Sequence, residues 1–420
     1  MNIRWLAVPL LLPLLVAAAQ PEAHPDLPPV AAVAAMLANH PDVLASKSGI
    51  RYEESNRLRL EAGSHEFNLQ VGAARRRNDQ SRHLNEWDVA IERPLRLPGK
   101  ARLDGELGRQ GVEQARLSLG DAMHETARGL LRSWFAWLKA RVQADEWGKQ
   151  VNLLRRQSEV AARRVRAGDA PRLEQTLAEA SMAQAEAAAV QGRLRESVAT
   201  AELKQNYPGI PMPGKPILAA PVPLDQPYDY WRERILQHNH ELAVARTEVQ
   251  RRQTLIARSQ ADELPDPTVG IRHASEAGGS DKITGLYLSI PLPGQARTAS
   301  TEGARAQMDM ATGREAALLR RLNAEISALH AGAAAAYEGW QKAQVAAQAM
   351  ERNAELIARA YALGEAGLTD TLNARRLAVD GKLAAAMAQL DALESRYRLM
   401  LDAHQLWLLD DELVRSDGMN

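Results

Sequence analysis

The chain has 420 residues, 52 basic and 52 acidic side chains, no cysteine and only 4% aromatic residues. The lack of cysteine excludes disulfide scaffolds, thiolate metal sites and thiol nucleophiles. Because the charges balance, there is no basic footprint of the kind that nucleic-acid binding needs, and we expect no nucleic-acid partner. No run of 18 or more apolar residues offers a membrane-spanning helix, and long tracts rich in Ala, Arg, Glu, Leu and Gln favour long helices over a compact core.

Residues 1–19 predict a signal peptide. Met1–Arg4 is short and positively charged, Trp5–Val16 is apolar, and Ala17–Ala19 supplies the small residues that precede a cleavage site. Two prolines inside the apolar run argue against the alternative, a buried N-terminal helix. We therefore expect the mature chain to leave the cytoplasm.

The remainder of the chain contains an internal repeat. The segment Pro98–Arg102 reappears 195 residues later as Pro293–Arg297, and Gly168 has a counterpart 196 residues later in Gly364. A proline-rich stretch joins the two copies. The predicted divisions are a first repeat over residues 20–206, a linker over 207–227, a second repeat over 228–412 and a tail over 413–420.

Each repeat begins with a helix, over residues 41–62 or 228–261, and continues into two short segments with period-two alternation. This alternation predicts strands with one apolar face, separated by polar loops over 75–86 and 273–282. The apolar positions are Phe67, Leu69, Val71, Trp87, Val89, Ile91, Val269, Ile271, Leu286, Leu288 and Ile290. The polar residues Gln70, Asp88 and Glu92 fall on the opposite parity, whereas Arg75 shares the parity of the apolar set.

A Pro-Gly turn, Pro98-Gly99 or Pro293-Gly294, then starts a long helical stretch in each repeat. The stretches 101–167 and 296–363 contain no proline, and 67 helical residues span roughly 100 Å. Breaks at 168–171 and 364–367 are followed by returning helices over 172–205 and 370–409. Each repeat is thus predicted to be a long antiparallel helical hairpin attached to a β-hairpin.

On the first returning helix, small and apolar residues recur at steps of three or four, which predicts a seam packed against a neighbouring helix. These residues are Leu173, Leu177, Ala180, Ala183, Ala187, Val190 and Leu194.

The strands indicate an oligomeric membrane barrel. One chain supplies four strands, whereas the smallest membrane barrels need about eight, so several chains must share one wall. Three chains would give twelve strands, with the apolar set facing lipid and Gln70, Asp88 and Glu92 facing a wet lumen. The alternative is a soluble β-hairpin packed on the helices.

Two segments resemble the TolC-like outer-membrane factor family, the outer-membrane efflux proteins. Tyr361–Ala374, of sequence YALGEAGLTDTLNA, is similar to the family's hairpin-tip pattern. Leu97–Arg102, of sequence LPGKAR, is similar to the strand-to-helix turn of its metal-cation efflux branch. With the order and duplication of the elements, the resemblance covers nearly the whole mature chain.

The resemblance implies a mainly α-helical fold with a small β part. The long hairpins would form an α-barrel in the periplasm, and a homotrimer would close a twelve-stranded β-barrel in the outer membrane of a Gram-negative bacterium. The implied function is the exit duct of a tripartite efflux pump or type I secretion system. Its implied partners are outer-membrane lipid, a periplasmic adaptor and an inner-membrane transporter of the RND or ABC type, with no cofactor.

The resemblance also assigns roles to individual residues. The hairpin tips that would dock an adaptor are marked by Gly168, Asp169, Pro171, Gly364, Gly367 and Leu368. A pore constriction is expected at Asp370, with Asn373 standing where the family has a second acid and Glu174 as the nearest counterpart in the first repeat. Pro171 departs from the usual tip pattern. A solvated acid at a helix start is the alternative role for Asp370.

Other functions have weaker support in the sequence. No catalytic, phosphate-binding or metal-ligand constellation is present, so we expect neither an enzyme nor a metal site; His238 and His240 would point to different sides of one helix. Trp134, Phe135, Trp137 and Trp147 are interpreted as helix packing, and the basic run Arg75–Arg77 as a solvated loop that can touch anionic lipid headgroups. A periplasmic adaptor or a coiled-coil structural protein remains the alternative function.

Overall fold

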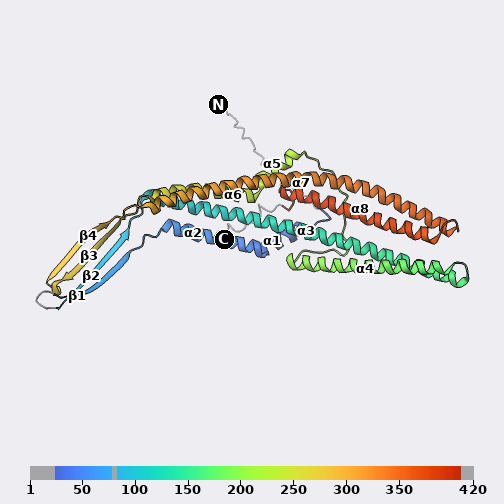
Figure 1. Cartoon of the computed structure of the whole chain (residues 1–420), viewed down its shortest axis with the longest axis horizontal. Helices are drawn as coiled ribbons and strands as arrows, with labels where there is room; N and C mark the ends of the chain where they lie inside the picture. The colour runs from blue at the N-terminus through green and yellow to red at the C-terminus, as the bar shows by residue number, and fades with distance from the viewer. Residues whose placement is uncertain (1–23, 78–82, 408–420) are drawn as a thin grey trace, which may run out of the picture.

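The computed structural model describes residues 24–77 and 83–407, and the predicted signal peptide (1–19) and C-terminal tail (413–420) lie outside these ranges. The molecule is strongly elongated (Figure 1): four strands extend from one end, and two helical hairpin tips form the other. The described chain therefore has the predicted class of fold, long helical hairpins with a small β part.

The four strands form one antiparallel sheet in the order β1-β2-β3-β4. Their bounds are β1 Asn68–Arg77, β2 His83–Pro94, β3 Thr268–Glu276 and β4 Asp281–Ser289. The two predicted hairpins are thus joined through β2 and β3. The predicted loops 75–86 and 273–282 are too long, because polar residues continue the strands where a neighbouring strand supplies a partner. Arg76, for example, pairs across the sheet with Glu86 at 3.0 Å and Glu276 at 3.4 Å.

The helices of the first repeat are α1 Val30–Asn39, α2 Pro41–Ala62, α3 Pro98–Ala167 and α4 Arg172–Asn206. Those of the second repeat are α5 Tyr228–His238, α6 His240–Asp262, α7 Gln295–Ala362 and α8 Leu368–Asp402. The continuous helix predicted over 228–261 is wrong: it breaks at Asn239, whose side-chain oxygen caps α6 by accepting from the Leu242 backbone N–H at 2.7 Å. Helix α1 was not predicted, and α8 ends at Asp402 rather than at 409.

The largest core lies near the middle of the rod, where α3 meets α8 and the N-terminal segment. Trp134, Phe135 and Trp137 are 2%, 0% and 3% exposed, which confirms that the aromatic cluster packs between helices. Trp134 Nε1 donates to the Asp26 carbonyl at 2.8 Å, and the Tyr397 hydroxyl donates to Asp26 Oδ1 at 2.8 Å. These bonds fasten the start of the described chain to the helical body.

The packing stripe predicted on α4 faces outward in the single chain. Leu173, Val190 and Leu194 are 65%, 56% and 63% exposed. The residues of α4 that pack on α3 and α8 are smaller, and they include Ala178, Ala185 and Ala189. Small side chains allow the helix backbones to approach closely, so α4 has one packed face and one unpartnered apolar face.

None of the described helices combines the length and the apolar character that crossing a membrane requires.

Four histidines from distant parts of the chain meet beside the core. The His404 ring centroid lies 5.0 Å from that of His124, 5.4 Å from His238 and 5.2 Å from His240. The expectation that His238 and His240 point apart is therefore wrong, because the break at Asn239 turns both toward His404. Within the described residues, no three His, Asp or Glu side chains are placed to hold a metal ion.

This cluster predicts a pH dependence of stability. Burial, aided by the nearby Arg128 cation, lowers the pKa of His124 from 6.5 to about 4. At this site the unfolded chain therefore binds a proton that the folded chain does not, and the contribution of His124 to stability falls as the pH drops from 6.5 toward 4, by about 1.4 kcal/mol per pH unit. Thermal unfolding of His124→Gln, which keeps a donor for the Leu401 carbonyl, should show a smaller slope than wild type in this window.

His330→Gln, on α7 outside the cluster, serves as the matched control and should retain the wild-type slope. Identical pH slopes for wild type and His124→Gln would contradict the assignment.

Candidate functional site

The sheet has two chemically different faces, and its register assigns each residue to one of them. Leu69 pairs with Ile91, Ile91 with Ile271 and Ile271 with Leu286, so these four apolar side chains form one row across all four strands. Val71 and Val89 form part of the next row on the same face. The predicted apolar set therefore shares one face, with Phe67 and Ile290 immediately outside β1 and β4.

The opposite face of the sheet is polar and internally hydrogen bonded. Glu92 accepts from Asn68 Nδ2 at 3.0 Å, from Gln70 Nε2 at 2.8 Å and from the Tyr287 hydroxyl at 2.6 Å. Arg272 pairs with Asp88 at 3.3 Å on the same face. Gln70, Asp88 and Glu92 thus lie on the side of the sheet that the alternation predicts for them.

The apolar face is exposed in the single chain. Leu69, Val71 and Leu286 are 64%, 72% and 83% exposed, and no helix in the described part of the chain covers the sheet (Figure 1). The alternative considered from the sequence, in which the strands pack on the chain's own helices, is therefore wrong for the described residues (Figure 1). An exposed apolar face of this extent is the kind of surface that marks a membrane or protein contact.

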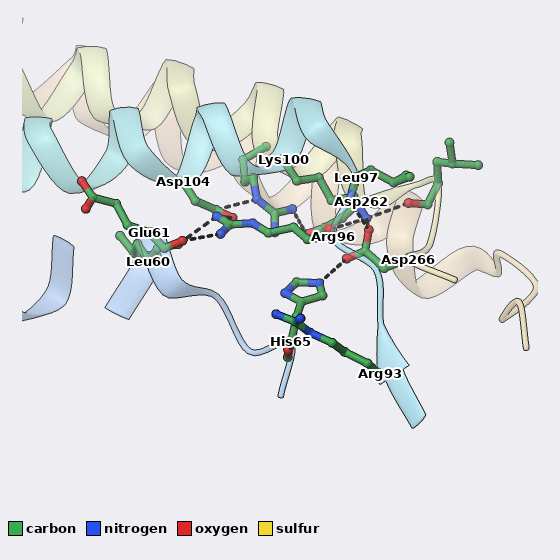
Figure 2. Close-up of polar contacts among 12 residues, drawn as sticks. Leu60, Glu61, His65, Arg93, Arg96, Leu97, Lys100, Asp104, Asp262 and Asp266 are labelled. Carbon is green, nitrogen blue, oxygen red and sulfur yellow. Dashed lines mark hydrogen bonds and ion pairs between the residues drawn. The ribbon is translucent and has the colours of Figure 1, made fainter. Parts of the chain in front are cut away.

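The sheet joins the helices through a buried ionic junction, shown in Figure 2. Lys100, in the first turn of α3, is only 2% exposed and contacts Asp262 at 3.1 Å, Asp266 at 2.9 Å and the Leu264 carbonyl at 2.7 Å. Asp266 also accepts from His65 at 3.0 Å. One lysine of the first repeat therefore holds the segment between α6 and β3 of the second repeat.

Arginine side chains extend this junction along the helices. Arg96 pairs with Asp104 and donates to the carbonyls of Leu60 and Glu61 at 2.8 and 2.9 Å (Figure 2). Arg258 bridges Asp104 at 2.6 Å and Asp262 at 2.5 Å. Helices α2, α3 and α6 are thereby tied together where they meet the strands.

The junction keeps its two central carboxylates ionised. Burial opposes ionisation of Asp262, but hydrogen bonds from Arg258 and Lys100 outweigh it and lower its pKa. Burial likewise opposes ionisation of Asp266, while bonds from Lys100, His65 and the Leu97 backbone N–H lower its pKa below the usual value. Removing Lys100 would leave two adjacent carboxylates without their shared cation.

Substitution of Lys100 tests the importance of this junction. We expect Lys100→Ala to destabilise the fold by about 3 kcal/mol, the lower end of the range for breaking a buried pair, because Asp262 is 43% exposed. Denaturant unfolding would measure the change. Gln295→Ala, at the equivalent and exposed position of the second repeat, is the control and should have little effect. Equal stability of the two variants would contradict the prediction.

The opposite end of the molecule consists of two hairpin tips. Gly168 and Gly364 end α3 and α7 with φ angles of 83° and 81°, a left-handed conformation that favours glycine. Pro171 and Gly367 precede the first residues of α4 and α8, and Asp169 is exposed. Leu368 is 3% exposed and packs with Ala161 and Ala178, so its side chain joins the two hairpins and does not face solvent.

A polar contact fastens the two tips together. The Tyr361 hydroxyl donates to Glu174 Oε2 at 3.0 Å, and Arg164 donates to the Tyr361 hydroxyl at 2.5 Å. Arg164 also lies over the Tyr361 ring and pairs with Glu174 at 3.4 Å. The resemblance implies a position for Glu174 near a pore, and in the single chain its carboxylate is bonded between the two hairpins.

The other two predicted pore residues lie one turn apart on α8. Asp370 is exposed in the first turn, close to Gly367, and Asn373 lines a pocket with Leu372 and Trp147. Among the described residues, no hydrogen bond or ion pair joins Asp370 to Asn373 or Glu174. The exposed Asp370 carboxylate is therefore compatible with both roles considered from the sequence: a ring of acids around the axis of an oligomer, and a favourable negative charge at the start of α8.

Sequence reasoning missed the junction and the tip contact. Lys100 interrupts the repeat, since its counterpart is Gln295, and this asymmetry is a signal of a role particular to the first repeat. Its partners lie more than 160 residues away and could not be identified without the fold. Tyr361 was noted only as part of a motif.

Comparisons with known proteins agree with this geometry. Residues 231–401 match the family model described as outer membrane efflux protein, which confirms the resemblance predicted from the sequence. No curated protein matches the chain at a significant level.

Three solved outer-membrane proteins share the fold. The Campylobacter jejuni CmeC channel has a TM-score of 0.76 at 14% identity, covering 92% of this chain and 88% of that one. VceC from Vibrio cholerae has a TM-score of 0.73 at 15% identity, covering 89% and 95%. The open state of the Neisseria gonorrhoeae MtrE channel has a TM-score of 0.72 at 16% identity, covering 91% and 90%.

Proposed function

We propose that this chain forms the outer-membrane exit duct of a tripartite efflux pump or type I secretion system, passively conducting substrates out of the cell. The observation that carries the proposal is the two-faced sheet, which has an exposed apolar face and a hydrogen-bonded polar face. The efflux protein match over residues 231–401 and the shared fold of three outer-membrane proteins support it.

The duct requires more than one chain. Strands β1 and β4 are the edges of a four-stranded sheet, and their unpaired backbone groups cannot remain open inside a bilayer. Three copies joined edge to edge would give a closed barrel of twelve strands, within the range of membrane barrels. We therefore propose a homotrimer with the apolar face toward lipid and Gln70, Asp88 and Glu92 toward the lumen.

The helical body supports the same oligomer. The outward apolar stripe of α4, which includes Leu173, Val190 and Leu194, supplies a seam for a neighbouring copy. Repetition of this contact around an axis would close the hairpins into an α-barrel in the periplasm.

The partners follow from the position of the hairpin tips. We propose that a periplasmic adaptor docks on the tips around Gly168, Asp169, Pro171, Gly364 and Gly367, and that an RND or ABC transporter in the inner membrane supplies the energy. The tips support this role because they lie at the end of the molecule farthest from the sheet (Figure 1). Residues 20–206 and 228–412 would be the two repeats of the mature chain, joined by 207–227.

The sheet also separates the duct from the alternative functions. A periplasmic adaptor or coiled-coil rod has no need of an uncovered apolar face on four paired strands. The metal-cation branch suggested by Leu97–Arg102 remains a proposal for the cargo, which growth of a deletion strain on metals, dyes and antibiotics would test.

Cell fractionation and electrical recording test the duct itself. The full chain should be found in the outer-membrane fraction as a heat-modifiable trimer, and the purified trimer should produce stable conductance steps in planar bilayers. A soluble periplasmic monomer without channel activity would refute the proposal.

Substitution of Asp370 tests the proposed constriction. If three copies of this carboxylate surround the axis, Asp370→Ala should raise single-channel conductance or reduce cation selectivity, because it removes a ring of negative charge. The control is Glu338→Ala, an exposed acid in the middle of α7. Unchanged conductance and selectivity in Asp370→Ala would leave the acid with its alternative role at the helix start.

A further inference from the structure

Positive side chains lie on the apolar face of the sheet at the end farthest from the helices. Arg75 pairs with Asn85, Arg77 with His83, and Lys282 with Ser275, which itself pairs with Trp87. By the alternation of strand side chains, Arg75, Arg77 and Lys282 share the face of Leu69, Ile91 and Leu286. We call Arg75, Arg77 and Lys282 the basic rim.

The basic rim differs from the arginine beside it. Arg76 points to the polar face, where Glu86 and Glu276 compensate its charge at 3.0 and 3.4 Å. Within residues 24–77 and 83–407, no ion pair involves Arg75, Arg77 or Lys282, and all three are exposed. Three cations thus remain uncompensated by the described residues on the face that carries the apolar rows.

The spacing places the basic rim at a membrane boundary. Phe67 lies at the helix-proximal edge of the apolar face, and ten residues separate it from Arg77. At about 3.4 Å per residue this is about 34 Å along the strand, or roughly 26 Å across a bilayer for a tilt of about 40°. The apolar band of membrane barrels is about 25 Å tall. Arg75 and Arg77 therefore lie at the edge of this band farthest from the helices.

An aromatic residue marks the same boundary. Trp87 lies in the row of Lys282 and is 48% exposed, and its ring centroid lies 5.7 Å from that of His273, with the two rings tilted by 55°. Tryptophan favours the level of the lipid headgroups, and Lys and Arg extend their charged ends toward it from just inside the apolar zone.

We propose that the basic rim binds the phosphate groups of lipids in the outer leaflet of the outer membrane. This inference rests on the proposed function, because helices in the periplasm place the far end of the strands at the cell surface. Arginine and lysine bind phosphate through charge-assisted hydrogen bonds, and the adjacent apolar rows accept the acyl chains of the same lipid. The barrel would thereby be fixed in depth at its outer edge.

A lipid titration tests the basic rim. The triple variant Arg75→Gln/Arg77→Gln/Lys282→Gln is purified with the wild type and titrated with diphosphoryl lipid A and with its monophosphoryl form, with bound lipids counted by native mass spectrometry. We expect the variant to bind diphosphoryl lipid A more weakly, by about fivefold for each charge removed. Wild type should prefer the diphosphoryl form, and added salt should reduce this preference.

A variant with the same loss of charge on the helical body is the control. Arg193→Gln/Arg314→Gln/Lys342→Gln removes three exposed cations from α4 and α7 and should bind lipid A like the wild type. Equal affinity of the basic-rim variant and wild type, in trimers that still insert and conduct, would overturn the proposal and leave the duct intact. A wild type that neither inserts nor forms trimers would refute the duct itself.

Discussion

The sheet is amphipathic and open at both edges, and one chain cannot satisfy either property in water. Leu69, Ile91, Ile271 and Leu286 form a row that none of the described helices covers (Figure 1), while β1 and β4 leave backbone donors and acceptors unpaired by described residues along their outer sides. A bilayer satisfies the first requirement and neighbouring copies the second. The proposed trimer, lumen and membrane position all follow from this constraint.

The junction at Lys100 connects this sheet to the helical body. A lysine almost without exposure, held by Asp262 and Asp266, links the start of α3 to the segment that enters β3. The strands of both repeats therefore leave the helical body with a fixed relation to each other, which the register between β2 and β3 requires. At the other end, Tyr361 and Glu174 make a smaller polar contact between the tips, where few apolar side chains are buried. The rod is thus joined between repeats at both ends, firmly beside the membrane and more lightly at the tips.

Much of the fold could be predicted because its signals are local. Period-two alternation identified the strands and the apolar face, the lack of proline identified the long helices, and Gly168 and Gly364 marked their ends. The predictions failed where a distant partner decided the outcome. The strands are longer than their polarity suggested because Arg76 on β1 pairs with acids on β2 and β3. The stripe of α4 is exposed because smaller residues pack on α3 and α8.

The duplicated architecture, the two chemical faces of the sheet and the number of strands per chain could be predicted from residue patterns alone. The strands and their faces depend on residues close together in the chain, and the duplication is visible as a repeated motif. Other features are visible only in the fold: the two hairpins join through β2 and β3, three other histidines meet His404, and Lys100 rather than its counterpart Gln295 holds the junction. Such contacts depend on which surfaces meet, and residues more than a hundred positions apart carry no local pattern that reveals their pairing. Arg75 and Arg77 show both levels: the sequence gives their charge, and the register of β1 on β2 assigns them to the apolar face.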